Sequence, residues 1–199
     1  MKNLVFYGDG LLCPPEGYSE QLMDGLVLRH PEAALQSFHP GEQHLTVEAA
    51  FKGAPFHVIG KAPDFVFLGL GTADLLQSAE PSGMRANLEA LLQLIQHKTR
   101  AHLAFTSVCE AFLPEESQRE KARAYNAGLS ALAGNGERVS FLDLNSHVNA
   151  FLEKHRRGAG EKRALHVLPL QLTSMGRVFL SHTALENLPW NGFLSAKAS

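Results

Sequence analysis

The residues best placed for chemistry follow two apolar runs that end abruptly in glycine and aspartate. The first run ends at GDGL, positions 8–11, and another ends at GTAD, positions 71–74. Breaks of this kind mark the carboxyl edge of a parallel sheet, where α/β proteins bind their ligands. Catalysis at such an edge needs side chains that react, such as a nucleophile or a group that exchanges protons. Gly10 and Ala73 stand at these two edges, and neither can supply such a group from a side chain.

Other reactive groups lie close by in the sequence. Cys13 comes shortly after Gly10 and is a candidate nucleophile, with His39 or His44 as its base. Asp9 is a candidate nucleophile or base. The structural alternatives are a small buried hydrophobic residue for Cys13 and a turn-holding hydrogen-bond acceptor for Asp9, and we favour both. The histidines and cysteines show no spacing typical of metal sites, so we expect no metal and no other cofactor.

The elements that must position these residues alternate between strands and helices. We expect strands at Leu4–Tyr7, Ala33–Phe38, Asp64–Leu70, His102–Val108 and Val139–Leu144. The alternation predicts right-handed crossovers and a parallel sheet covered on both faces, a three-layer α/β/α fold. In the five-stranded order 2-1-3-4-5, the topological switch point lies between the first and third strands. Positions 8–11 and 71–74 follow those two strands, so topology places the site there.

Caps and breakers divide the helical segments. Thr46 is typical of an N-cap, and Gly53 and Pro55 are expected to end the helix that it starts early. Other helices are expected from Ser19 to Pro31, from Pro81 or Ser82, at Glu115–Leu132, at Ser146–Arg157 and from Thr173 to about Leu185. Residues Arg157–Arg163 are interpreted as a solvated loop, and Leu165–Leu170 as an extended apolar segment.

Composition bounds the class of protein. The 199 residues are 45% hydrophobic, and 18 Lys and Arg are balanced by 20 Asp and Glu. We expect a single domain over residues 1–195 with a frayed tail at 196–199. Without a basic face we expect no nucleic-acid partner, and without a long apolar stretch we expect no membrane partner. A cytoplasmic location with reduced thiols is the simplest interpretation.

An apolar patch lies near the carboxyl terminus. It consists of Leu188, Trp190, Phe193 and Leu194. We expect the patch to pack back onto the domain. The alternative is a partner-binding tail or a contact in a homo-oligomer.

Taken in order, these motifs resemble those of the SGNH/GDSL hydrolases, a superfamily of esterases and lipases with a flavodoxin-like fold. The first block of that family reads G-D-S-L, and positions 8–11 match it except that Gly10 replaces the nucleophilic serine. The second block supplies an oxyanion-hole glycine, which Gly41 matches. The third block reads G-x-N-D, and positions 71–74 match it with Ala73 in place of the asparagine.

The fifth block of the family reads D-x-x-H and continues into a short Leu-Thr-x-x-Gly segment. Positions 172–176 match that continuation. The alignment puts Leu168 where the family has its aspartate and Gln171 where it has the catalytic histidine. The resemblance extends from Met1 to about Leu185.

The resemblance implies an esterase architecture without its reacting groups. Gln171 cannot exchange a proton near neutral pH, and Leu168 cannot orient a base. Losing the serine alone costs on the order of a million-fold in turnover in a triad protease. We therefore expect a catalytically inactive protein that binds a small molecule, an acylated glycan or a protein partner at the former active-site cleft. The expected binding residues are Asp9, Gly10, Gly41, Ala73, Leu168 and Gln171.

Three alternatives stay open at this point. The cleft can be filled, so that the fold serves as an interaction scaffold. The protein can be an active esterase with relocated residues, in which Cys13, Asp9 or a nearby histidine such as His39 reacts. It can also be the non-catalytic partner subunit of an active homologue.

Overall fold

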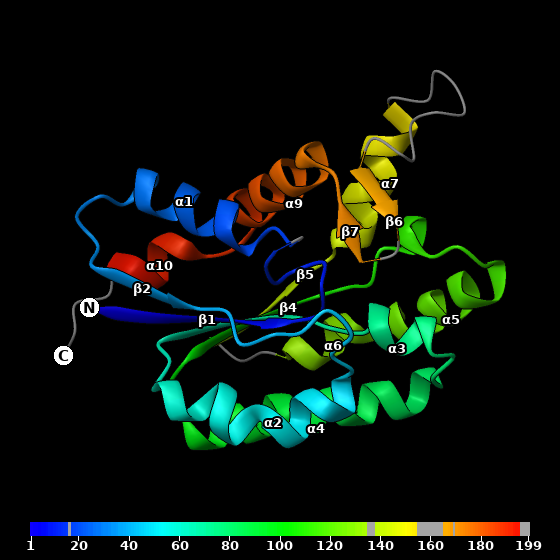
Figure 1. The fold of residues 1–199 in the computed structure, drawn as a ribbon. Coiled ribbons are helices and arrows are strands. Elements are labelled where there is room, and N and C mark those ends of the chain that lie inside the picture. The colour runs from blue at the N-terminus through cyan, green and yellow to red at the C-terminus, as the bar shows by residue number, and fades with distance from the viewer. Residues whose placement is uncertain (16, 135–137, 155–164, 169, 196–199) are drawn as a thin grey trace.

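A five-stranded parallel sheet in the order β2-β1-β3-β4-β5 forms the middle layer of the molecule (Figure 1). The computed structural model describes residues 1–15, 17–134, 138–154, 165–168 and 170–195. The strands are β1 (Lys2–Gly8), β2 (Leu35–Phe38), β3 (Phe65–Gly69), β4 (His102–Thr106) and β5 (Val139–Leu142). The order and the parallel pairing confirm the predicted α/β/α fold and its switch point between β1 and β3.

Helices cover both faces of this sheet, as Figure 1 shows. One face carries α2 (Val47–His57), α4 (Pro81–Lys98), α5 (Glu116–Asn126) and α6 (Leu129–Ala133). The other face carries α1 (Ser19–Arg29), α7 (Leu144–Lys154), α9 (Ser174–Asn187) and α10 (Trp190–Ser195). Short connecting elements are η1 (Ile59–Lys61), α3 (Thr72–Leu76), η2 (Glu110–Phe112) and the antiparallel pair β6 (His166–Leu168) and β7 (Gln171–Leu172). Over the described ranges, no helix is both long and apolar enough to cross a membrane.

The two apolar cores follow from the two-residue period of the strands. In β1, Val5 and Tyr7 belong to the core under α2 and α4, whereas Leu4 and Phe6 belong to the core under α1 and α9. All four side chains are at most 1% exposed. A strand buried on both faces reads as a continuous apolar run, because successive side chains point to opposite layers. This explains why the strands were found in the sequence.

The α2 helix departs from its prediction. It continues through Gly53 and Pro55 to His57, although both residues were expected to end it early. Burial of Val47, Ala50 and Ala54 against the sheet supplies the tertiary packing that stabilises most helices in proteins. Gly53 also serves this packing, since a Cβ there would lie 2.8 Å from the Tyr7 hydroxyl oxygen. The packing of the buried face of α2 therefore outweighs the tendency of Gly53 and Pro55 to end the helix.

The predicted helix at Glu115–Leu132 is in fact two helices. The chain breaks between α5 and α6 at Gly128, whose φ of +90° lies in the left-handed region that favours glycine. Asn126, the last residue of α5, fixes this break. Its side chain accepts a hydrogen bond from the Val108 amide at 2.9 Å and donates one to the Val108 carbonyl at 2.8 Å. These two hydrogen bonds between the Asn126 side chain and the loop after β4 therefore fix the end of α5.

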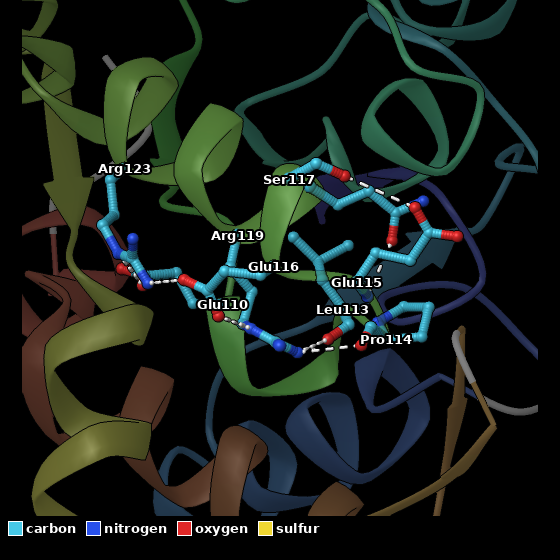
Figure 2. A network of polar contacts seen from close by, with 9 residues as sticks. Glu110, Leu113, Pro114, Glu115, Glu116, Ser117, Arg119 and Arg123 are labelled. Carbon is cyan, nitrogen blue, oxygen red and sulfur yellow. Dashed lines mark hydrogen bonds and ion pairs between the residues drawn. The ribbon is translucent and has the colours of Figure 1, made fainter.

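A network of ion pairs joins η2 to the first turns of α5 (Figure 2). Arg123 pairs with Glu110 and Glu116 at 2.8 Å each, and Arg119 pairs with Glu116 at 2.9 Å. Arg119 also donates to the carbonyl of Leu113 at 2.7 Å. Exposed pairs of this kind contribute little each, so the network orders the loop more than it stabilises the fold.

The apolar residues near the carboxyl terminus pack back onto the domain, as expected. The rings of Trp190 and Phe193 lie 4.5 Å and 5.1 Å from that of Phe65, measured between centroids. The indole nitrogen of Trp190 donates to the Ala184 carbonyl at 2.9 Å. Leu188 is 7% exposed. The loop predicted at 157–163 and the tail predicted at 196–199 lie outside the described residues.

Two glycines at the same helical position give opposite predictions. Gly176 and Gly83 are each the third residue of their helices, α9 and α4. A Cβ at Gly176 would lie 2.0 Å from the Leu165 carbonyl oxygen, whereas nothing lies within 4 Å of a Cβ at Gly83. Gly176→Ala should lower the free energy of unfolding by roughly 1–3 kcal/mol, a typical cost of overpacking. Gly83→Ala should raise it by up to about 1 kcal/mol. Urea denaturation of both variants tests this, and a neutral Gly176→Ala would contradict the described contact.

Candidate functional site

The carboxyl ends of β1 and β3 meet without side chains between them. Gly8 is paired with Gly69 in the parallel register, and the Asp9 amide donates to the Gly69 carbonyl at 2.9 Å. A Cβ on Gly8 would lie 2.2 Å from that carbonyl oxygen, so only glycine allows this approach. The segments at 8–11 and 71–74 therefore start side by side, where the topology places a ligand site.

Gly10 is buried beneath two neighbouring segments. Its amide donates to the Gln43 carbonyl at 3.1 Å. A Cβ on Gly10 would lie 3.1 Å from Gln43 Cγ and 3.1 Å from the Leu170 carbonyl oxygen. A side chain at this position would therefore point into packed atoms. The open cleft that one of our hypotheses requires is not formed above Gly10 by the described residues.

Leu170 reaches this place through an unusual backbone. Its φ is +64°, which is rare for a residue other than glycine, and its side chain is 1% exposed. It belongs to the same apolar core as Leu11 and Ala73. The cost of a left-handed conformation, of the order of 1–2 kcal/mol, is offset by burying a whole leucine side chain.

The segment around Leu170 is a bulged hairpin. The extended segment predicted at Leu165–Leu170 is β6, which pairs with β7 and places Leu168 opposite Gln171. The Thr173 amide closes the hairpin on the Leu165 carbonyl at 3.0 Å. Gln171 is partly exposed, and the side chain of Leu168 lies outside the described part of the chain. The strand pair was not predicted, because a two-residue strand leaves no periodic signal.

Ala73 and Asp74 hold the start of α3 in place. Ala73 is fully buried. The Asp74 carboxylate accepts the Val47 amide at 3.0 Å and 3.2 Å and so anchors the first turn of α2. Burial raises the pKa of Asp74, and the Val47 hydrogen bond opposes this rise. This carboxylate is therefore already used by a helix amino terminus, where a negative charge is favourable.

Gly41 packs against the turn that follows β1. A Cβ on Gly41 would lie 2.2 Å from the Gly8 carbonyl oxygen and 2.3 Å from Cys13 Sγ. The amides of Gly8 and Gly41 face the Cys13 sulfur and lower its pKa. Gly41, which the resemblance assigns to the oxyanion hole, thus has the Cys13 thiol and a backbone carbonyl as its near neighbours.

Cys13 is buried and hydrogen bonded to the backbone. Its side chain is 1% exposed, and its thiol donates to the Phe6 carbonyl at 3.5 Å. Burial raises the pKa of Cys13 to about 12, against the opposing effect of the two facing amides. A reactive cysteine needs the thiolate form and access to solvent. The geometry of this residue is that of a small buried hydrophobic group.

The base considered for Cys13 is hydrogen bonded elsewhere. His39 Nδ1 lies 2.8 Å from Ser19 Oγ, and its ring stacks on Phe6 with centroids 5.0 Å apart. Burial lowers the pKa of His39, and the nearby Glu20 partly opposes this. The neutral imidazole can accept the serine proton, which is the arrangement of an activated nucleophile. However, Ser19 is 0% exposed, so a substrate carbonyl has no path to its hydroxyl oxygen.

The sequence did not single out the Ser19–His39 pair. The two residues are 20 positions apart and lie at the amino end of α1 and just beyond β2. Both of these ends lie at the carboxyl edge of the sheet, and this topological argument was the signal available for finding the pair. His44 is exposed. In the resolved ranges given above, no group of three or more His, Cys, Asp or Glu is placed to hold a metal.

Asp9 holds the turn after β1 from a buried position. It is 2% exposed, and its Oδ1 accepts the Leu11 amide at 3.1 Å. Burial raises the pKa of Asp9 to about 7. The amides of Leu11, Ala73 and Thr72 oppose this rise, and the charge of Asp74 adds to it. The nearby amides thus offset part of the free-energy cost of burying this carboxyl, but the effect of burial on its pKa remains the larger one.

A thiol-reactive reagent tests the burial of both cysteines. Burial raises the pKa of Cys13 and of Cys109, and both side chains are at most 2% exposed. We expect an aromatic disulfide reagent to modify neither thiol in the native protein and both after unfolding in guanidinium. In unfolded Cys13→Ala, the reagent should modify one thiol per chain instead of two. Rapid native modification that disappears in Cys13→Ala would contradict the described site.

The geometry above can be set beside that of known proteins. A model of the GDSL-like lipase/acylhydrolase family matches residues 7–168. A search of curated proteins found no match to the sequence. The acetylxylan esterase Axe2 from Geobacillus stearothermophilus has a similar structure, with a TM-score of 0.78, 18% identity and 95% of each chain covered.

Two further structures share the fold. A lipolytic protein of the G-D-S-L family from Veillonella parvula matches with a TM-score of 0.74 and 14% identity over 94% of this chain and 98% of that one. The acetyl xylan esterase AlAXEase matches with a TM-score of 0.76 and 17% identity over 92% of this chain and 98% of that one. At these identities the structural likeness shows the fold, and the family model shows the membership. The chain belongs to the GDSL-like lipase/acylhydrolase family.

Proposed function

We propose that this protein does not hydrolyse esters and acts by binding a ligand on the surface around Gly10. One observation carries the proposal. The position where the family places its serine nucleophile is a buried glycine, with Gln43 Cγ and the Leu170 carbonyl oxygen each 3.1 Å from where its Cβ would be. Glycine supplies no nucleophile at that position, and a side chain there would need both neighbours to move by a few tenths of an ångström.

The other reactive groups do not replace the missing serine. Ala73 offers no side-chain donor for an oxyanion, and the amide of Gln171 cannot act as a general base. Cys13 and Asp9 are at most 2% exposed. The groups of a catalytic triad act as a unit, so the losses at these positions are not compensated one by one.

Because Gln43 and Leu170 cover Gly10, the proposed ligand surface consists of the exposed residues around this position. Gln43 is exposed, and Gly41 and Gln171 are partly exposed, so a ligand meets these residues first. We call these three residues the Gly10 face. Two carboxamide side chains offer both donors and acceptors, which suits a hydroxyl-rich chain. Two structural neighbours are acetylxylan esterases, so an acetylated xylo-oligosaccharide is the first ligand to test. A small molecule and a protein partner are the other ligand classes.

A second candidate function rests on the Ser19–His39 hydrogen bond of 2.8 Å. In this alternative the protein is an esterase with a relocated serine and base. It requires α1 to move, because Ser19 is 0% exposed. We rank it below the binding proposal for that reason.

Ester hydrolysis separates the two candidates. We expect the purified protein to hydrolyse p-nitrophenyl acetate no faster than an equal concentration of Ser19→Ala or Cys13→Ala. Gly10→Ser should also leave the rate at background, because no histidine replaces Gln171. Turnover that is abolished by Ser19→Ala or by Cys13→Ala would refute the proposed loss of catalysis and identify the nucleophile.

Ligand binding is measured by calorimetry with acetylated xylo-oligosaccharides. Gln43→Ala should weaken the affinity by about 2–10-fold, which corresponds to one lost hydrogen bond. The matched control is Gln93→Ala, which removes the same exposed side chain from α4. If both substitutions weakened the affinity equally, or if neither changed it, a ligand surface at the Gly10 face would be contradicted.

A further inference from the structure

A pocket opens at the amino edge of the sheet, at the end of the strands opposite to Gly10. It lies between the last turns of α1 and α9 and the start of α10, and its volume is about 360 Å³. Trp190, which lines it, packs on Phe65, the first residue of β3. Ligand pockets in proteins commonly have volumes of about 300–1,000 Å³. This pocket therefore has the size that a small molecule needs.

Two helices that run side by side in the same direction form the walls of the pocket (Figure 1). A Cβ on Gly25 of α1 would lie 2.4 Å from Leu185 Cδ1 of α9, so the helices are in close contact just before they end. The floor consists of Leu26, Leu188 and Trp190, which are at most 7% exposed. An apolar group of a ligand would therefore lie against a buried apolar surface, which is favourable.

The rim of the pocket carries one charge of each sign, on opposite walls. Arg29 of α1 donates a hydrogen bond to Glu186 of α9, and the two side chains are 42% and 48% exposed. The hydrogen bond from Arg29 lowers the pKa of Glu186, so its carboxylate is ionised near neutral pH. An exposed ion pair of this kind contributes little to stability, so a ligand can take over both partners at small cost.

These charges select the class of ligand. A simple anion would be repelled by Glu186, and a simple cation would be repelled by Arg29. A zwitterion offers a partner to both groups, and the planar guanidinium of arginine matches a carboxylate. The last carbonyl groups of α1 and α9 also face this end of the molecule, and the partial negative charge of helix carboxyl ends favours an ammonium group.

We propose that this pocket binds a free α-amino acid with an aliphatic side chain. The ligand carboxylate pairs with the Arg29 guanidinium, its ammonium group pairs with the Glu186 carboxylate, and its side chain lies on the apolar floor. The seven residues of β1 separate this pocket from the Gly10 face by about 20 Å. The site is therefore independent of the ligand surface proposed above, and either proposal can fail alone.

The first test uses the unaltered protein and L-leucine as the probe. We expect saturable shifts of backbone amide NMR signals at residues 26–30 and 185–190. L-Leucinamide lacks the carboxylate and N-acetyl-L-leucine lacks the ammonium group, so each should bind about tenfold more weakly than L-leucine. Glycine, which has no side chain for the floor, should also bind about tenfold more weakly.

Two variants assign the charges of the ligand to the two walls. Arg29→Gln should weaken L-leucine binding about tenfold and leave L-leucinamide binding unchanged, because the amide has no carboxylate to lose a partner. By the same argument, Glu186→Gln should weaken L-leucine but not N-acetyl-L-leucine. Arg100→Gln and Glu153→Gln remove exposed charges away from the pocket and should bind L-leucine as the wild type does.

Three results would overturn the proposal. The first is the absence of saturable shifts at these residues with millimolar L-leucine. The second is equal affinity for L-leucine and its two derivatives, which would show that the charges are not recognised. The third is an Arg29→Gln variant that weakens L-leucine and L-leucinamide alike, since the guanidinium would then not be the partner of the carboxylate.

Discussion

The structure depends on the backbone contact between the carboxyl ends of β1 and β3. Gly8 and Gly69 approach each other there, and Gly41 packs against the Gly8 carbonyl from a third segment. Three chain segments meet at one point only because none of them carries a Cβ at the contact. The same closeness buries Asp9, which is 2% exposed, and this burial raises the pKa of its carboxyl.

Much of this architecture is readable in the sequence, for a physical reason. Strands buried on two faces are apolar runs, and the runs at β1 and β3 stop where the backbone must turn, so their ends were predicted closely. The α2 helix shows the limit of local signals. Gly53 and Pro55 disfavour a helix locally, but the buried face of Val47, Ala50 and Ala54 decides the outcome. The break between α5 and α6 depends on two hydrogen bonds between the Asn126 side chain and the Val108 backbone, a contact between residues distant in sequence.

The candidate site was predicted less completely than the fold. Topology located Gly10 and Ala73 at one edge, since the order of the strands fixes which ends are neighbours. The closure of that edge was not predictable, because it depends on the left-handed backbone of Leu170 and on the placement of Gln43. The partner of His39 was missed for a similar reason. A hydrogen bond between Ser19 and an imidazole 20 positions away leaves no pattern in composition or periodicity.

The position of the Leu170 carbonyl makes the exchange of residues at position 10 asymmetric. Glycine needs no room there, and once the carbonyl and Gln43 Cγ lie 3.1 Å from the vacant Cβ position, any larger residue requires both neighbours to yield by a few tenths of an ångström. Moving the Leu170 backbone would also disturb the Leu170 side chain, which is buried in the core and only 1% exposed. A serine in place of Gly10 would therefore need adjustment in two segments that are distant in sequence, one at Gln43 and the other at Leu170.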